Sequence, residues 1–112
     1  MKRGDVVLAE VYFTDLSGVK IRPVVVVSSD AVNRGDDRVV IPVSSNVAKP
    51  SRWGVLARDS DAAFKRTGLR RTSVFRCDKV LTLSKALIRR RLGTADLYLG
   101  KIAKCLGDAL GL

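Results

Sequence analysis

The side chains that could do chemistry in this chain are limited first by the absence of histidine. Without an imidazole there is no serine–histidine or cysteine–histidine nucleophile, and the commonest general acid and base is missing. Catalysis must then use carboxylates, arginines, lysines, hydroxyls or a cysteine. In that set the carboxylates are weak bases, and the guanidiniums are strong binders of anionic oxygens.

The two cysteines, Cys77 and Cys105, do not make a metal site. Structural zinc usually has four cysteine or histidine ligands, and two thiols fall short of that number. We expect both thiols to be reduced, with Cys105 on the apolar face of a helix near the end of the chain. We predict no metal and no other cofactor.

The charge balance points to an anionic partner. The 112 residues include 21 Lys and Arg against 11 Asp and Glu, which gives a formal net charge of +10. Unpaired charges are costly to bury, so this excess must lie mainly on the surface, where it attracts RNA, DNA, an acidic protein segment or an anionic membrane. No stretch approaches the roughly 18 apolar residues of a membrane span, and the start of the chain lacks the apolar run of a signal peptide. We therefore expect a cytoplasmic protein without a membrane partner.

The elements that must position these groups are mostly short strands within one domain, residues 1–112. The run Val24–Val27 is apolar on both faces and predicts a central strand, with Pro23 at its start or at a bulge because proline cannot donate to a ladder. The polar segment Asp59–Gly68 has room for one helical turn. The predicted strands are Asp5–Phe13, Ile21–Ser28, Arg38–Ser45, Arg52–Arg58 and Thr72–Leu83, with a short basic strand within Ser84–Leu92.

The end of the chain predicts a helix. Thr94 is a suitable N-cap and Gly111 a suitable C-cap, and apolar residues between them recur at helical spacing. The apolar stripe consists of Leu99, Ile102, Ala103, Leu106, Ala109 and Leu110. Short antiparallel strands followed by one amphipathic helix predict a mainly β fold, a small curled barrel or half-barrel with the helix packed on the sheet.

Three sequence blocks carry a more specific signal. The blocks are Arg3–Leu8 followed by Gly18–Ser28, then Val40–Ser45, then Arg70–Lys79. The first holds a Gly-Asp strand and an Arg-Pro pair, the second a strand ending in hydroxyl residues, and the third an Arg-Cys-Asp triplet. In this order, and over nearly the whole chain, they resemble the MazF/PemK family of toxins.

That resemblance implies an SH3-like barrel with a C-terminal helix, assembled as a homodimer. It implies a type II toxin–antitoxin endoribonuclease that cleaves single-stranded mRNA at short sequence motifs without metal. Cleavage would leave a 2′,3′-cyclic phosphate and a 5′-hydroxyl. The substrate supplies its own nucleophile, the 2′-hydroxyl that DNA lacks, so the protein must supply a base and positive charge. The implied protein partner is a cognate antitoxin with an acidic tail.

The resemblance also implies a catalytic set: Arg22, Ser44, Arg76 and Asp78. Asp78 is the implied base. Arg76 is the family's proposed general acid, but a guanidinium releases protons poorly, so we expect it to hold phosphate oxygens instead. Arg22 would neutralise the phosphate, and Ser44 would donate a hydrogen bond, with Ser45 as the alternative one residue along. Each of these side chains also has a purely structural interpretation, such as an ion pair or an ordinary strand arginine.

Further residues are candidates for holding RNA. These are Lys20, which could replace a loop histidine that some family members have, together with Ser45, Arg70 and Arg71. The Arg89–Arg91 run could follow an RNA backbone or an acidic antitoxin, or could simply be solvated. Trp53, Phe64 and Phe75 could stack on bases, or belong to the core.

Two other functions compete with cleavage. One is a non-catalytic toxin of the same fold that poisons gyrase, as CcdB-like relatives do through a tryptophan near the C-terminus; this chain ends in Leu110-Gly111-Leu112. The other is a basic SH3-like module that binds RNA without cutting it.

Overall fold

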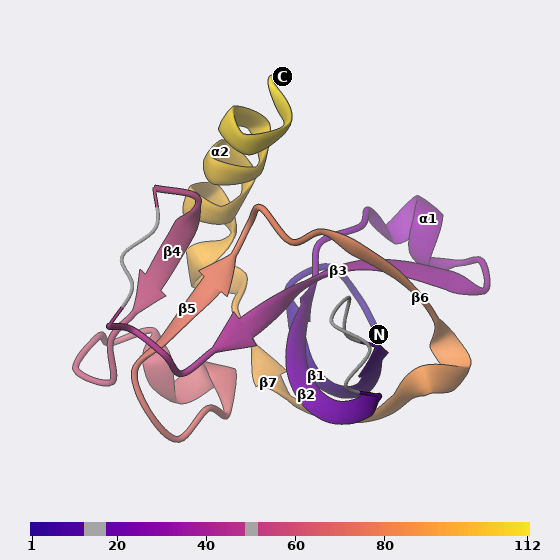
Figure 1. The fold of residues 1–112 in the computed structure, drawn as a ribbon, viewed down its shortest axis with the longest axis horizontal. Helices are drawn as coiled ribbons and strands as arrows, with labels where there is room; N and C mark the ends of the chain where they lie inside the picture. Colours follow the sequence, from indigo (N-terminus) through magenta and orange to yellow (C-terminus); the bar gives the residue numbers. More distant parts are fainter. Residues whose placement is uncertain (13–17, 49–51) are drawn as a thin grey trace.

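The computed structural model describes residues 1–12, 18–48 and 52–112. Strands make up most of the regular secondary structure, and one long helix lies at the end of the chain (Figure 1). The strands are β1 (Asp5–Tyr12), β2 (Val19–Val26), β3 (Asp37–Ser44), β4 (Gly54–Ala57), β5 (Ser73–Arg76), β6 (Leu81–Ser84) and β7 (Ile88–Thr94). The helices are α1 (Asp30–Asn33), α2 (Leu99–Leu110) and the single 3-10 turns η1 (Phe64–Thr67), η2 (Lys85–Leu87) and η3 (Asp96–Tyr98).

The strands form one curled antiparallel sheet in the order β4-β5-β3-β2-β1-β7, with β6 also paired to β3. Along one edge of β3, its first half pairs with β6 and its last two residues pair with β5. β3 thus belongs to two parts of the sheet, which bend away from each other in Figure 1. The expected fold class, a barrel-like mainly β protein with a C-terminal helix, is confirmed.

The central strand is the one that the valine run predicted. β2 lies between β1 and β3, and Val24, Val25 and Val26 are fully buried. Pro23, however, lies inside β2 opposite Leu8 of β1, rather than at its start. Proline is tolerated there because the β2–β3 pairing begins only at Val24, so at Pro23 the strand pairs with β1 alone.

The prediction of one long strand over Thr72–Leu83 is wrong. The chain leaves the sheet after Arg76, turns, and re-enters it as β6 at Leu81. The β5–β3 register pairs Phe75 with Val43, whereas the β6–β3 register pairs Leu81 with Val40. Three extra residues therefore lie opposite this stretch of β3, which contains Pro42 with no N–H to offer.

The ends of the predicted helix are partly confirmed. The prediction of Thr94 as the N-cap is wrong: its hydroxyl accepts the Asp96 N–H at 3.1 Å, but the N-cap of α2 is Tyr98 and that of η3 is Ala95. Gly111 ends α2 in the left-handed region at φ 75°, as predicted. The polar segment between β2 and β3 contains α1, capped by the Ser29 hydroxyl. The end of the first predicted strand, Phe13, and most of the following turn lie outside the described residues.

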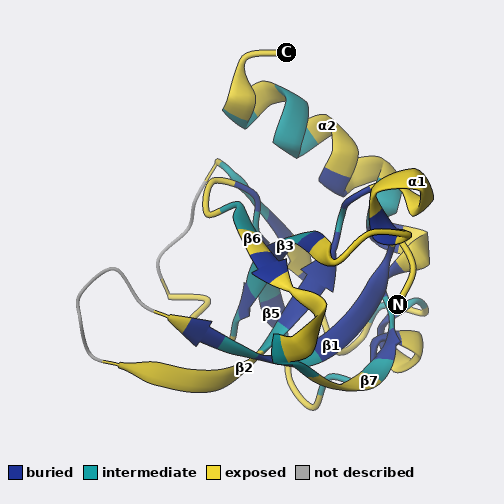
Figure 2. Cartoon of the chain, turned by 90° about the vertical axis from the view of Figure 1, so that its right-hand side faces the viewer, coloured by how far each residue is buried: buried dark blue, intermediate teal, exposed yellow. Residues whose placement is uncertain are grey.

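The main core lies between the sheet and α2. Phe75 of β5 is fully buried and meets Tyr98 edge-on, with ring centroids 5.4 Å apart. Ile102 is the buried residue of α2 in this core, Cys105 and Leu106 pack against the core while partly exposed, and the outer half of the helix is teal and yellow in Figure 2. Of the predicted stripe, Ile102 is buried, three residues are partly buried, and two are exposed: Leu99, Leu106 and Ala109, and Ala103 and Leu110, respectively. No helix of the described residues is long and apolar enough to cross a membrane.

Two glycines allow η1 to lie directly against β7. A Cβ at Gly93 would collide with the carbonyl oxygen of Arg66, and one at Gly68 with that of Leu92. Gly68 also has φ 73°, a conformation that side chains disfavour. The segment that leads to Arg70 is in this way held to β7 by close backbone approach.

Candidate active site and nucleic-acid groove

One face of the sheet carries a row of residues across three strands. Ser44 of β3 pairs with Val74 of β5, and Val74 pairs with Leu56 of β4. Partners across a sheet project to the same face. Ser44 therefore lies at one end of a partly exposed apolar strip made by Val74 and Leu56. Arg22 of β2 pairs with Ala9 of β1, beyond the end of the β2–β3 pairing, and lines the same groove as Ser44.

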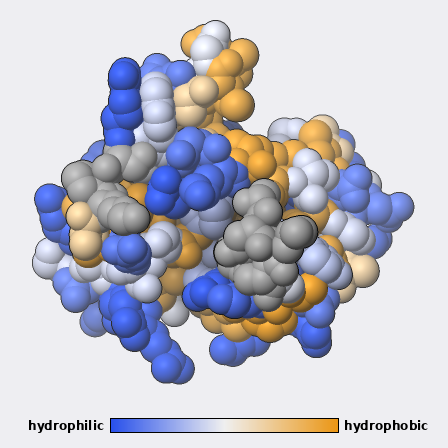
Figure 3. Space-filling model, in the orientation of Figure 1, coloured by the Kyte–Doolittle hydropathy of each residue, from blue (hydrophilic) through white to orange (hydrophobic). Residues whose placement is uncertain are grey.

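Arg76 and Asp78 lie at the end of β5, next to this row. Arg76 is two residues from Val74 and so projects to the same face, opposite Gly54 of β4. Its guanidinium contacts the Asp78 carboxylate through Nε–Oδ1 and Nη2–Oδ2, both at 3.4 Å. The two side chains are 23% and 31% exposed, so water and solutes reach both. Figure 3 shows hydrophilic atoms gathered over this end of β5.

Cys77, between these two residues, points the other way. It is fully buried, its N–H donates to the Trp53 carbonyl at 2.8 Å, and its sulfur lies 4.0 Å from the Ile102 oxygen. Burial, followed by contact with the Cys105 thiol, raises the pKa of Cys77 to about 12. A thiol this hard to ionise is a poor nucleophile. The cysteine therefore orients the two charged residues from the core and does not itself face the site.

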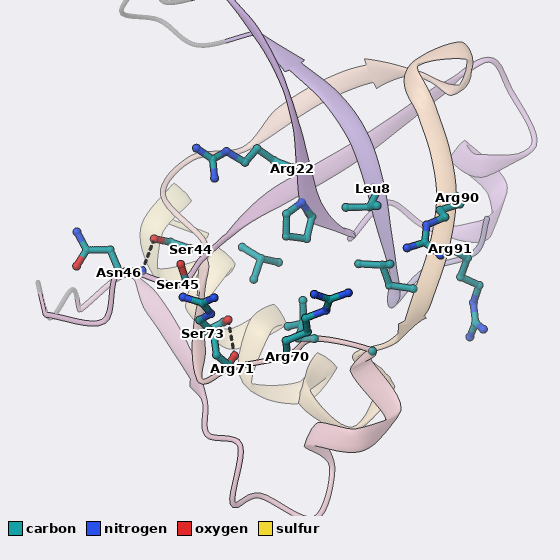
Figure 4. Close-up of a pocket in the computed structure, with 15 residues that line it drawn as sticks. Leu8, Arg22, Ser44, Ser45, Asn46, Arg70, Arg71, Ser73, Arg90 and Arg91 are labelled. Carbon is teal, nitrogen blue, oxygen red and sulfur yellow. Dashed lines mark hydrogen bonds between the residues drawn. The ribbon is translucent and has the colours of Figure 1, made fainter.

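Beside this face lies an open groove of about 760 Å³, shown in Figure 4. Five arginines and three serines line it, and the described lining residues include no aspartate or glutamate. Its polar wall is made of Arg22, Ser44, Ser45, Asn46, Arg70, Arg71, Ser73, Arg90 and Arg91, and its apolar part of Leu8, Pro23, Val43, Leu69 and Leu92, with Gly68. The groove thus combines a cationic rim with an apolar floor, which suits an anionic ligand that has flat apolar groups.

The two serines differ in position. The Ser44 hydroxyl accepts the Asn46 N–H at 3.2 Å and still has its own proton to donate. Ser45 lies just beyond the end of β3, is exposed, and lines the groove. Ser44 shares the face of Arg76, whereas the next residue alternates away from it. The geometry favours Ser44 for the hydroxyl role that the sequence left open between the two.

Five of the eight predicted site residues line one groove: Arg22, Ser44, Ser45, Arg70 and Arg71. Arg76 and Asp78 contact each other on the adjoining face and do not line the groove. Lys20 lies further along β2, exposed, opposite Val11. The structure therefore groups the predicted residues as a charged pair, a row beside it, and a neighbouring cationic groove.

The aromatic candidates for base stacking differ in burial. Phe64 and Phe75 are buried in the core and cannot stack on a base, whereas Trp53 is partly exposed and carries the Arg52 guanidinium 4.4 Å from its ring centroid.

Two arginines of the Arg89–Arg91 run form ion pairs. Arg89 is bound to Glu10 at 2.9 Å and Arg91 to Asp5 at 3.0 Å. In the part of the chain that the structure describes, no three side chains of histidine, cysteine, aspartate or glutamate gather as they would around a metal.

Sequence reasoning did not single out Arg90. It lies between two ion-paired arginines, and the pairing of β7 with β1 shifts register between Leu8 and Ala9 and again between Val6 and Val7. These irregularities, rather than simple alternation, decide that Arg90 lies opposite Leu8 and enters the groove.

Solved structures share this fold over the full chain. An endoribonuclease in complex with its cognate antitoxin, from Mycobacterial species, is 25% identical with a TM-score of 0.79, and the match covers 100% of this chain and 96% of that one. MazF (Form-I) from Deinococcus radiodurans is 24% identical with a TM-score of 0.76, covering 100% and 97%. A MazE–MazF structure (Form-II) from the same organism is 23% identical with a TM-score of 0.74, covering 100% and 96%.

The fold is therefore a small barrel-like β protein with a C-terminal helix, the class to which these solved structures belong. No protein of curated function matches the sequence. Residues 2–107 match the family described as "PemK-like, MazF-like toxin of type II toxin-antitoxin system". The chain belongs to this PemK/MazF family.

Proposed function

We propose that this toxin is a metal-independent endoribonuclease that cleaves single-stranded RNA at specific short sequences. The observation that carries the proposal is the partly exposed Arg76–Asp78 ion pair, beside the face of β3 and β5 that carries Ser44. Together with Arg22, which lines the groove with Ser44, these residues supply a base, two guanidiniums and a hydroxyl, the groups that the proposed reaction needs. Family membership and the 25% identical endoribonuclease support the same activity.

In the proposed reaction the 2′-hydroxyl of the substrate is the nucleophile. Asp78 takes its proton, the 2′-oxygen bonds to phosphorus, and the bond from phosphorus to the 5′-oxygen breaks. The products are a 2′,3′-cyclic phosphate and a 5′-hydroxyl, and the leaving oxygen takes a proton from water. Negative charge grows on the phosphate oxygens during this step, and Arg76 and Arg22 stabilise it, with a hydrogen bond from Ser44.

The ion pair between Arg76 and Asp78 suits this chemistry because it is loose. At 3.4 Å its contacts are longer than the roughly 2.7–2.9 Å of a strong charged hydrogen bond. A phosphate that approaches the Arg76 guanidinium competes with the carboxylate for the same donors. Binding of substrate therefore frees Asp78 for the hydroxyl proton at the point where that proton must leave.

The remaining predicted residues would hold the strand on either side of the scissile phosphate. Arg70 and Arg71 enter the groove from the segment before β5, and Ser45 lies at its rim. Lys20 adds positive charge along β2 beyond Arg22. Such contacts follow the backbone and carry no sequence preference themselves, so base readout would come from other contacts.

The proposed partners are a second copy of the chain and an acidic antitoxin, and the proposed location is the cytoplasm. Leu110 on the outer half of α2 and Leu56 on the site face are exposed apolar residues, and covering them would favour a dimer. The Mycobacterial endoribonuclease was solved with its cognate antitoxin, and the Deinococcus structure pairs MazF with MazE. Sizing at micromolar concentration should give about twice the chain mass of 12.2 kDa; a strict monomer would contradict the dimer.

The test of the activity is cleavage of single-stranded RNA in excess EDTA, with analysis of the product ends. We expect cyclic phosphate ends that disappear in Arg76→Ala and Asp78→Ala. Lys104→Ala and Asp108→Ala are matched controls, because they remove an exposed ion pair of 3.1 Å from α2, and they should leave cleavage intact. Binding without cutting would instead support an RNA-binding module, and cleavage that requires added metal would overturn the mechanism.

A further inference from the structure

Three neighbouring arginines of β7 have different surroundings. Arg89 is held by Glu10 and Arg91 by Asp5, whose side chain is only 4% exposed. Arg90 has no ion-pair or hydrogen-bond partner among the described residues, and its guanidinium reaches into the groove in Figure 4, whereas that of Arg91 turns away. The strand thus presents one available cation between two that are already neutralised.

Arg90 belongs to a continuous row that forms part of the groove floor. It pairs with Leu8 of β1, and Leu8 pairs with Pro23 of β2. All three line the groove, and Leu8 and Pro23 are partly exposed. An apolar surface two residues wide therefore runs from Arg90 toward the rim at Arg22.

The opposite wall supplies two more available cations. Arg70 and Arg71 come from the segment before β5, are exposed, and have no side-chain partner in the described part of the molecule. Gly68 and Gly93 fix this segment against β7, so the two walls are held at a set separation. Leaving three guanidiniums without counterions in one hollow is unfavourable unless an anion occupies it.

We propose that this groove is a binding subsite for the RNA segment adjoining the scissile phosphate, with Arg90 as a further phosphate-binding residue. The subsite takes one nucleobase over Leu8 and Pro23, with backbone phosphates on Arg90 at one wall and on Arg70 at the other. It meets the cleavage site at Ser44, which lines the groove and also belongs to the row beside Arg76. This inference rests on the proposed function, because it assigns the adjoining strand to the same substrate.

The arrangement of guanidiniums on two walls, with an apolar floor between them, suits a nucleic acid better than a compact anion. A phosphate or sulfate ion would use one or two of the guanidiniums and leave the apolar floor uncovered. A single strand alternates phosphates with flat bases, so it can place a base on the apolar floor and phosphates on the guanidiniums at the same time. The recognised chemistry is therefore a single-stranded polynucleotide that extends to one side of the cut.

The experiment compares Arg90→Gln with Arg89→Gln. Both remove one positive charge from β7, but Arg89 is bound to Glu10 and does not line the groove. The probe is a fluorescent all-deoxy strand of about 10 nucleotides, which cannot be cut because it lacks the 2′-hydroxyl. We expect Arg90→Gln to weaken binding about 5- to 10-fold and to reduce the salt slope of log Kd by about 0.7–1. Arg89→Gln should bind like the wild type, and Arg90→Lys should recover part of the loss.

The outcomes separate this inference from the proposed activity. Equal losses of affinity for the deoxy strand in Arg90→Gln and Arg89→Gln would mean that binding depends only on the net charge of the protein. That result would overturn the subsite. If Arg90→Gln lost binding to an acidic peptide but bound the deoxy strand like the wild type, the groove would belong to a protein partner. That result would also overturn the RNA subsite. If the strand binds through Arg90 but RNA is never cut, the activity fails and the subsite stands. If RNA is cut through Asp78 while Arg90→Gln changes neither binding nor KM, the activity stands and the subsite is overturned.

Discussion

Arg76 and Asp78 contact each other side by side across a residue, Cys77, whose side chain lies in the core on the other side of the strand. The turn that follows β5 explains this: it is closed by a hydrogen bond of 3.3 Å from the Lys79 N–H to the Arg76 carbonyl, and within it Cys77 is buried while Asp78 is exposed. The buried cysteine, held by the Trp53 carbonyl, fixes the direction of both charged neighbours. The triplet is thus a positioning device in which the middle residue is structural and the outer two are available to substrate.

Replacing the carboxylate tests the base most directly. Asp78→Asn keeps the size of the side chain and removes its ability to accept the hydroxyl proton. We expect RNA cleavage to fall by at least about 100-fold, the usual contribution of a general base. Binding of the deoxy strand should not weaken, because a negative charge near the phosphate is removed. A variant that still cleaves at the wild-type rate would eliminate Asp78 as the base.

The fork of Arg76 should matter as well as its charge. Arg76→Lys keeps one positive charge but loses the paired donors that can bind two phosphate oxygens at once. We expect kcat to fall about 10- to 100-fold, and further in Arg76→Ala, where loss of an anion-stabilising donor typically costs 100- to 1,000-fold. Single-turnover cleavage at saturating enzyme measures this step. Equal activity of the lysine and wild-type proteins would show that a point charge suffices.

Ser44 and Ser45 should affect different kinetic constants. Ser44 shares the face of Arg76, so Ser44→Ala should lower kcat by about 10-fold, the value of one hydrogen bond worth about 1.4 kcal/mol. Ser45 lies at the rim of the groove, so Ser45→Ala should raise KM and leave kcat nearly unchanged. Steady-state kinetics on one short RNA distinguish the two. The opposite pattern would move the hydroxyl role to Ser45.

The cysteine of the triplet should be dispensable for chemistry. Burial raises the pKa of Cys77 to about 12, so the thiol stays protonated at neutral pH. Cys77→Ala keeps the backbone bond to Trp53 and should cleave RNA within about twofold of the wild-type rate. Its free energy of unfolding should fall by about 1 kcal/mol, because a buried sulfur is lost. A large loss of activity without loss of stability would point to a chemical role.

The Tyr98–Asp61 hydrogen bond, 2.9 Å long, predicts a pH-dependent difference in stability. The Arg58 N–H and the Tyr98 hydroxyl hold the pKa of Asp61 below its ordinary value of 3.8, so this stabilisation is present above that pH and is lost as the pH falls. Burial and Asp61 raise the pKa of Tyr98 to about 12, so on the alkaline side the stabilisation is lost as the pH rises from 10. The difference in Tm between wild type and Tyr98→Phe should therefore be largest near neutral pH and shrink at both extremes. A constant difference would contradict this role.

Much of the strand pattern was predictable because local residues decide it. The valine run specified the central strand, and Gly111 specified the end of α2, since both depend on apolarity or backbone conformation at single positions. The division of Thr72–Leu83 was not predictable, because residues on both sides of the break are good strand formers. It depends on which part of β3 each half meets, and that partner is distant in sequence.

The candidate site, too, was predictable in part. The blocks around Arg22, Ser44 and Asp78 indicated which residues matter, but their grouping depends on the β2–β3 and β3–β5 registers. Arg90 could not be separated from its neighbours by type, because all three are arginines. Its distinct position comes from the register shifts between β1 and β7 and from the acidic partners of Arg89 and Arg91.

The close approach at Gly68 and Gly93 sets the groove width through main-chain atoms rather than through side chains. The arginines on its walls are consequently exchangeable without moving the frame that carries them. A relative of this toxin can acquire a different strength of binding to the flanking strand by substituting at position 70, 71 or 90 alone. A side chain at position 93, by contrast, would separate the walls and alter recognition at every one of these positions together.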